Sequence, residues 1–174
     1  QALVAFKHLI ELVHQYSTIR TTFDPNLRPQ LWSSQAKMVS TINALAAEAN
    51  IILPGVNEGE ILMGSRDPEK IADFYLGNSH YTDTVIVKVG SKGAYVKVKG
   101  GQGSMVAGYH VDKVIDTVGA GDGFAVGVIT GLLEGLSNKQ AALRGNAIGS
   151  LAVQAPGDND GYPTQAELRT YQAK

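Results

Sequence analysis

The most informative absence in this chain is cysteine. None of the 174 residues is a cysteine, which excludes disulfide bonds, thiolate metal sites and thiol nucleophiles. The same absence suits a reducing compartment, so we expect a cytoplasmic protein. No apolar run approaches the roughly 20 residues that cross a bilayer, and the residues from Gln1 to Val4 lack the pattern of a signal peptide. The sequence therefore predicts neither a membrane partner nor secretion.

A charge excess of either sign is also missing. Fifteen basic and sixteen acidic side chains give a formal net charge of -1, so no global field attracts nucleic acid. An apolar content of 44% with 18% charged residues is ordinary for a globular protein. We therefore expect a single domain over residues 1–174 that binds small molecules, and a homo-oligomer is compatible with this composition.

Several familiar motifs are absent as well. The chain has no Gly-x-x-x-x-Gly-Lys-Ser/Thr loop and no His-Arg-Asp loop, so P-loop NTPases and protein kinases lack support. Gly119-x-Gly121 lacks the rest of a dinucleotide fingerprint. The four histidines do not have metal-ligand spacing. A phosphate or metal site of one of these standard kinds is therefore not expected.

The spacing of apolar residues predicts strands that alternate with helices. Helices are expected at the start of the chain and near residues 33–49, 58–63, 68–76, 121–136, 138–153 and from 164 onward. Strands are expected near residues 18–23, 51–53, 84–89, 94–98 and 105–115. The helix at 121–136 is apolar almost all round, so we expect it to be buried. The β-α-β rhythm followed by hairpins predicts an α/β fold with a mixed sheet.

One stretch carries the chemistry, from Asp116 to Asp122. Its small residues Gly119, Ala120 and Gly121 place successive backbone N–H groups at a helix N-terminus, which favours anions. Asp122 falls in the first helical turn, where a carboxylate can accept a hydroxyl proton during phosphoryl transfer. The residues alone fit a tight glycine turn before an ordinary acidic helix start equally well.

This stretch resembles, residue for residue, the signature of the ribokinase-like (pfkB) carbohydrate kinases. Asn57-Glu58-Gly59-Glu60 is similar to the Asn-x-x-Glu motif of that family, and Lys88 to Ala94 is similar to its nucleotide-binding turn. Gly157-Asp158 also follows the last core helix as in the family. The resemblance implies a three-layer, ribokinase-like fold with a mixed, mostly parallel central sheet, and an enzyme that uses ATP and magnesium.

The resemblance also implies roles for individual residues. Asp122 is the implied base, and Gly119, Ala120 and Gly121 are the implied anion hole. Contacts with ATP are implied for Asn57, Lys88, Gly90, Ser91, Lys92, Gly93 and Asn146. Glu60 is implied to order magnesium through water, and Asp158 to touch the substrate. Ordinary helix capping, a plain hairpin turn and solvated side chains explain the same residues without any ligand.

Within the family, Phe23 to Pro29 together with Leu31-Trp32 is most similar to the 2-dehydro-3-deoxygluconate kinases. That similarity implies transfer of the γ-phosphoryl group of ATP to a primary hydroxyl of this sugar acid, with Asn26 and Arg28 on the substrate. A guanidinium can hold a carboxylate with two hydrogen bonds and so distinguish a sugar acid from a neutral sugar. Fructokinases share much of this segment, so a fructokinase or another sugar kinase is the alternative.

The N-terminal half of the family has no counterpart in these residues. That half supplies further strands, most sugar contacts and the lid, so we expect the chain to be a fragment that holds the ATP-binding and catalytic portion. A nucleotide-binding module without turnover is the competing hypothesis. If strands are missing, the strand at 18–23 should form an open edge, with Ile19, Thr21 and Phe23 more exposed than Ile86 or Val87.

Overall fold

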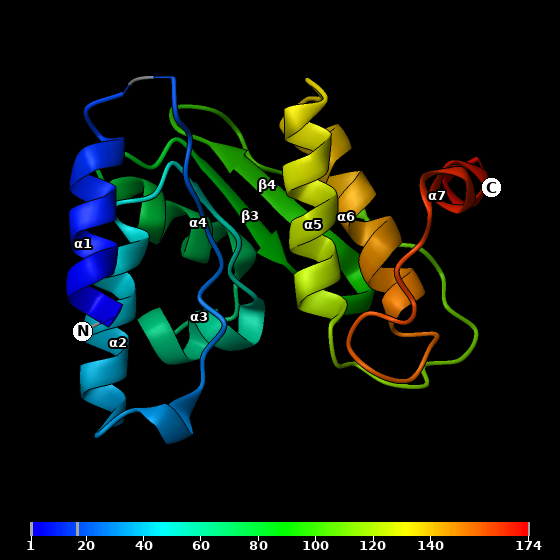
Figure 1. Cartoon of the computed structure of the whole chain (residues 1–174), viewed down its shortest axis with the longest axis horizontal. Coiled ribbons are helices and arrows are strands. Elements are labelled where there is room, and N and C mark those ends of the chain that lie inside the picture. Colours follow the sequence, from blue (N-terminus) through cyan, green and yellow to red (C-terminus); the bar gives the residue numbers. More distant parts are fainter. Residues whose placement is uncertain (1, 17, 174) are drawn as a thin grey trace.

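The structure is a computed structural model that describes residues 2–16 and 18–173. Helices and strands alternate along the first half, and the last third is helical (Figure 1). The elements are α1 (Ala2–Val13), β1 (Thr22–Phe23), η1 (Pro29–Leu31), α2 (Gln35–Ala46), β2 (Ile51–Ile52), α3 (Val56–Met63), α4 (Pro68–Gly77), β3 (Thr84–Lys88), η2 (Gly90–Lys92), β4 (Gly93–Val98), β5 (Ser104–Ala107), α5 (Ala120–Leu133), α6 (Asn138–Ala152) and α7 (Gln165–Gln172). No helix within these described ranges is both long and apolar enough to span a bilayer.

The strands form one sheet in the order β1-β2-β3-β4-β5. β1 pairs with β2 and β2 with β3 in parallel, whereas β3–β4 and β4–β5 are antiparallel. The predicted mixed sheet is therefore confirmed, although its parallel and antiparallel pairings are equal in number instead of mostly parallel.

Alternation along β2 and β3 separates two cores, one on each face of the sheet. Ile52, Val85 and Val87 point to one face and pack with α2, α3 and α4. Leu53 and Ile86 point to the other face and pack with α5 and α6, which lie side by side in Figure 1. Successive strand residues face opposite ways, so the two helix layers and the sheet make the expected three-layer fold.

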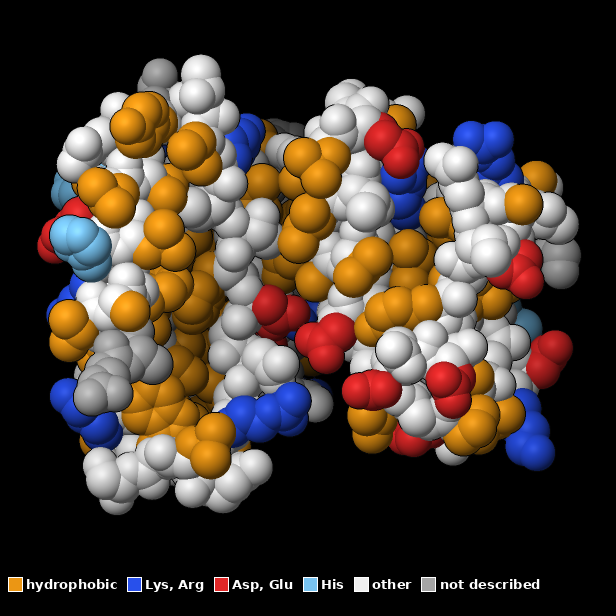
Figure 2. Space-filling view, viewed as in Figure 1, with side chains coloured by type: hydrophobic (Ala, Val, Ile, Leu, Met, Phe, Trp, Pro, Cys, Tyr) orange, Lys and Arg blue, Asp and Glu red, His pale blue; other side chains and the backbone are white. Residues whose placement is uncertain are grey.

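Two predicted elements are shorter or more exposed than expected. The extended stretch predicted at 105–115 is a strand only over Ser104–Ala107, because residues 108–111 leave the sheet to line a cavity. The helix predicted to be buried all round exposes Val126, Ile129 and Leu133. Only the side of α5 that meets the sheet and α6 is covered. Figure 2 shows hydrophobic side chains on the exposed side of this helix.

The first strand forms an open edge of the sheet, as predicted. It is reduced to Thr22–Phe23, and in the described part of the chain it pairs with β2 alone. The side chain of Ile19 is 47% exposed, whereas Ile86 and Val87 are fully buried. Phe23 is half-buried, so the expected difference in exposure is confirmed.

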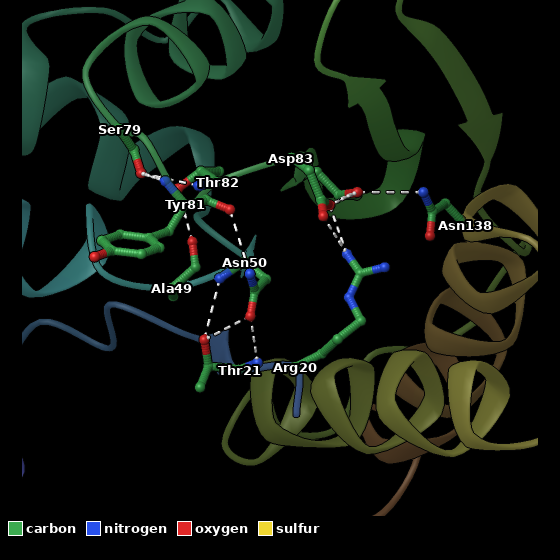
Figure 3. Close-up of polar contacts among 10 residues, drawn as sticks. Arg20, Thr21, Ala49, Asn50, Ser79, Tyr81, Thr82, Asp83 and Asn138 are labelled. Carbon is green, nitrogen blue, oxygen red and sulfur yellow. Dashed lines mark hydrogen bonds and ion pairs between the residues drawn. The ribbon is translucent and has the colours of Figure 1, made fainter. Parts of the chain in front are cut away.

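A polar network holds the amino ends of the parallel strands together (Figure 3). The Asn50 side chain accepts hydrogen bonds from the backbone N–H of Thr21 at 2.9 Å and donates to the carbonyl of Tyr81 at 3.3 Å. Arg20 donates to both carboxylate oxygens of Asp83 at 2.5 and 2.8 Å. Side chains thus help to set the register of the very short β1. The carboxyl ends of the strands, where α/β proteins bind ligands, lie at the opposite end of the sheet from this network.

Candidate active site

The turn that begins α5 has the geometry predicted for an anion site. Gly119 is the N-cap of α5 with a φ of 77°, a left-handed conformation that favours glycine. A Cβ at this position would lie only 1.7 Å from the carbonyl oxygen of Asp158. Asp122 stands in the first turn of the helix and is exposed. The loop at 157–161 therefore packs directly on the turn, and glycine is required there for two independent reasons.

The peptide unit between Gly119 and Ala120 is held through its carbonyl oxygen. That oxygen accepts hydrogen bonds from the backbone N–H of Gly123 and from the hydroxyl of Tyr162, each at 2.8 Å. The N–H of Ala120 makes only a long contact of 3.4 Å with the carbonyl of Thr117. An anion at the start of α5 could therefore replace this weak contact. Sequence reasoning missed Tyr162, because no motif around it indicates its direction.

A cavity of about 690 Å³ lies beside this turn. It is walled by seven residues predicted to bind ATP or an anion, namely Lys88, Gly90, Ser91, Gly93, Ala120, Gly121 and Asn146. The side chains of Phe124, Val114 and Val153 form an apolar part of the cavity wall. The structure therefore brings together pieces that are up to about sixty residues apart in sequence.

Asn146 lines the cavity, but its amide nitrogen is already occupied. It is buried and donates to the carbonyl oxygens of Val106 and Ala107 at 3.1 and 3.0 Å. These bonds tie α6 to β5. The side chain thus shapes the cavity wall where β5 ends, in addition to any contact it makes with a ligand.

Three partly buried charged side chains meet where Lys88 lines the cavity. The ammonium of Lys88 donates to the two carboxylate oxygens of Asp24 at 2.8 and 2.7 Å and lies 3.9 Å from Glu58. Burial raises the pKa of Asp24, and the charge of Lys88 offsets part of that rise. Asp24 and Glu58 lie within the two motifs at 23–29 and 57–60, but the sequence predicted no role for either residue. Their partner Lys88 is too far away in the chain for the sequence to indicate the contact.

Asp116 joins the turn to the loop after α6. One carboxylate oxygen accepts from the backbone N–H of Val118 at 3.0 Å and the other from that of Gly157 at 3.4 Å. These backbone donors hold the pKa of Asp116 below its usual value. The loop therefore stays over the turn, although the side chain of Asp158 itself is exposed.

The other predicted site residues lie outside the lining of this cavity. Asn26 and Arg28 are exposed on the loop after β1, where Asn26 has a φ of 37°. Asn57 is exposed at the start of α3, and Lys92 is exposed in η2. The carboxylate of Glu60 pairs with Arg66 at 2.8 Å. Over residues 2–16 and 18–173, no cluster of three or more acidic or histidine side chains could hold a metal ion.

Known proteins resemble this chain in both sequence and structure. It is 55% identical over 150 residues to the 2-dehydro-3-deoxygluconokinase of Bacillus subtilis (strain 168), covering 86% of this chain and 45% of that protein. The crystal structure of a PfkB protein from Polaromonas sp. JS666 superposes with a TM-score of 0.81 at 42% identity, covering 95% of this chain and 50% of that one. A putative ribokinase II from E. coli, in complex with ATP and Mg²⁺, gives a TM-score of 0.82 at 27% identity, covering 96% and 52%.

The chain spans about half the length of the relatives that it matches. The model of the pfkB family carbohydrate kinases matches residues 3–165, nearly the whole chain. The three layers formed by the sheet and its two sets of helices agree with the solved structures that superpose on this chain. The chain therefore belongs to the pfkB family of carbohydrate kinases.

Proposed function

We propose that residues 1–174 form the ATP-binding and catalytic portion of a sugar-acid kinase that phosphorylates a primary hydroxyl of 2-dehydro-3-deoxygluconate. One observation carries this proposal. Ala120 and Gly121 belong both to the helix start and to the cavity wall, so a nucleotide in the cavity would direct its phosphates at the N-terminus of α5. The 55% identity to a 2-dehydro-3-deoxygluconokinase supports the choice of substrate.

The cavity suits a nucleotide in size and in chemistry. Its volume of about 690 Å³ falls within the ~300–1,000 Å³ of typical small-molecule sites. Phe124, Val114 and Val153 offer apolar surface for a base and ribose. Lys88 and Gly121 lie at the end where phosphates would meet a positive charge and the helix N-terminus. The base and the phosphates thus have separate places.

Asp122 would act as the base in the transfer. The substrate hydroxyl oxygen forms a bond to the γ-phosphorus, the bond from that phosphorus to the β-bridging oxygen breaks, and the hydroxyl proton passes to the Asp122 carboxylate. Backbone N–H groups of Gly119, Ala120 and Gly121 would hold the charge of the migrating phosphoryl group. Asp122 is exposed, so a sugar can approach it.

Magnesium is the cofactor that this chemistry implies, and it would neutralise phosphate charge when bound. The described side chains offer no metal-binding cluster. They therefore fit only an ion that keeps its waters and arrives with the phosphates. Glu60 would meet such an ion through water after releasing Arg66, its present partner at 2.8 Å.

The proposal is tested by a coupled assay that follows ADP release with 2-dehydro-3-deoxygluconate. The assay is run on this chain and on an N-terminally extended form of the enzyme. Turnover by the extended form but not by this chain would support the proposal that residues 1–174 are the catalytic portion of a larger kinase. Absence of turnover in both forms would contradict the kinase proposal. Nucleotide binding without turnover in either form would favour the binding-module alternative. Faster turnover of fructose than of the sugar acid would favour a fructokinase.

Arg28→Ala is expected to raise the KM for the sugar acid about 10- to 100-fold, the loss for a charge-assisted hydrogen bond. Arg28 is exposed on the loop after β1, which leaves its guanidinium free to meet a substrate carboxylate. Initial rates of the extended enzyme measure the effect. Arg20→Ala is the matched control, because Arg20 pairs with Asp83 at the far end of the sheet. An equal loss for neutral sugars would rule out carboxylate recognition.

Tyr162→Phe is expected to lower kcat about 2- to 10-fold with little change in the KM for ATP, the scale of one neutral hydrogen bond. The hydroxyl of Tyr162 holds the carbonyl oxygen of Gly119 at 2.8 Å. It therefore orients and polarises the peptide unit that presents the N–H of Ala120. Tyr75→Phe is the control, since it removes a hydroxyl bonded to Asn43 on the opposite face of the sheet. An unchanged kcat in Tyr162→Phe would contradict this positioning role.

A further inference from the structure

We propose that Asp24 is a positioning residue that couples occupation of the nucleotide cavity to the substrate loop, here residues 24–32. The inference rests on the proposed function and deepens it, because it joins the two substrate sites through one partly buried ion pair. Asp24 opens the loop that carries Asn26 and Arg28. Its partner Lys88 ends β3 and lines the cavity.

The ion pair is largely shielded from solvent and has the geometry of a strong interaction. Both carboxylate oxygens of Asp24 accept from Lys88, at 2.8 and 2.7 Å. The side chains of Lys88, Asp24 and Glu58 are only 19%, 20% and 18% exposed. A buried charge that loses its partner is unfavourable, so the loop follows any change in the position of Lys88.

Lys88 also lies where a phosphate group would bind. A Cβ on Gly121 would stand 3.8 Å from its ammonium nitrogen, which places that nitrogen against the first turn of α5. A nucleotide phosphate at this turn would compete with Asp24 and Glu58 for the single ammonium group. Two carboxylates already share one positive charge, so the added negative charge redistributes the ammonium's hydrogen bonds.

The loop is built to respond to that redistribution. Glu58 accepts hydrogen bonds from the backbone N–H of Gly55 at 2.6 Å and, more weakly, from that of Leu27 at 3.4 Å. Asn26, between Asp24 and Leu27, has a φ of 37°, a left-handed conformation that asparagine adopts more often than other residues with side chains. The same charged cluster therefore holds the loop near both Asp24 and Leu27, on either side of the left-handed Asn26.

The chain contains a natural reporter of the loop. Trp32 is the only tryptophan in the sequence, and it is the C-cap of η1, whose N-cap is Arg28. Its half-buried ring packs against the core of α2, α3 and α4. A shift of the loop would change the environment of this ring, and with it the fluorescence.

The experiment titrates this chain with the non-hydrolysable ATP analogue AMP-PNP in magnesium chloride. Tryptophan emission follows the loop, and calorimetry measures binding independently. The wild-type chain is expected to show a saturable change in emission with the same midpoint as binding. Asp24→Asn should lose most of that change while it binds the analogue at least as tightly, because a negative charge beside the phosphates is removed. A merely structural role for Asp24 would instead weaken binding.

Asp83→Asn is the matched control. Asp83 is also an ion-paired aspartate, but it pairs with Arg20 at the amino ends of the strands, away from the cavity. It should keep the full emission change. Lys88→Gln serves as a second variant and should lose the emission change and weaken binding. A full emission change at saturation in Asp24→Asn, or in Lys88→Gln if Asp24→Asn does not fold, would overturn the coupling. Absence of calorimetric binding in the wild-type chain would instead count against the proposed function, and binding without any emission change would refute the coupling alone.

Discussion

Asp122→Asn is expected to lower the turnover number of the extended enzyme about 10²- to 10⁴-fold, the usual size of a general-base contribution. The asparagine side chain keeps the shape of the aspartate but cannot accept the hydroxyl proton. Binding of ATP should change little, because Asp122 is exposed and lies outside the cavity lining. Single-turnover kinetics with the sugar acid, together with calorimetry for the nucleotide, separates the two effects.

Asp67→Asn is the control for this substitution. Asp67 also stands at a helix start, where its carboxylate accepts from the backbone N–H of Glu69 at 2.9 Å, and asparagine caps helices as well as aspartate does. The control should therefore keep both the fold and the activity. Wild-type turnover in Asp122→Asn would remove the base assignment and leave Asp122 as an ordinary helix-start residue.

Gly119→Ala is expected to lower kcat about 10²- to 10³-fold, as when a donor of an oxyanion hole is lost. The added methyl group would lie 1.7 Å from the carbonyl oxygen of Asp158. Either the loop at 157–161 or the turn must therefore move, and the N–H groups of Ala120 and Gly121 lose their alignment. The free energy of unfolding should fall as well, and thermal denaturation measures that loss.

Gly135→Ala separates the clash from backbone strain. Gly135 has a φ of 80°, close to the 77° of Gly119, but a Cβ there would meet no atom within 4 Å. Both variants have the strain of a left-handed residue, roughly 1–2 kcal/mol. The kcat of Gly119→Ala should therefore be lower than the kcat of its control, Gly135→Ala. Equal kcat values for the two variants would show that the turn tolerates a side chain and that its packing against the loop is not needed for catalysis.

Most of the secondary structure was predictable because local sequence encodes it. The helix at Asn138–Ala152 begins after Ser137, whose side chain accepts from the backbone N–H of Gln140, a capping box readable from the sequence. The predicted strand at 84–89 and the strand at 94–98 are observed within one residue of their predicted ends. The strand predicted at 18–23 was wrong for residues 18–21, because an edge strand keeps only the residues that a neighbour pairs.

The sequence by itself determined most of the elements, the glycine turn at the start of α5 and the family resemblance, since each depends on residues within a few positions of one another. Only the tertiary structure decided that Asp24 pairs with Lys88, 64 residues away, and that Tyr162 reaches Gly119 across 43 residues. It also decided that residues 108–111 leave the sheet and wall the cavity. Local spacing sets which side of a helix or strand is apolar. The packing of the layers then sets which distant polar groups meet, because buried charges and carbonyl groups take the partners that packing brings within reach.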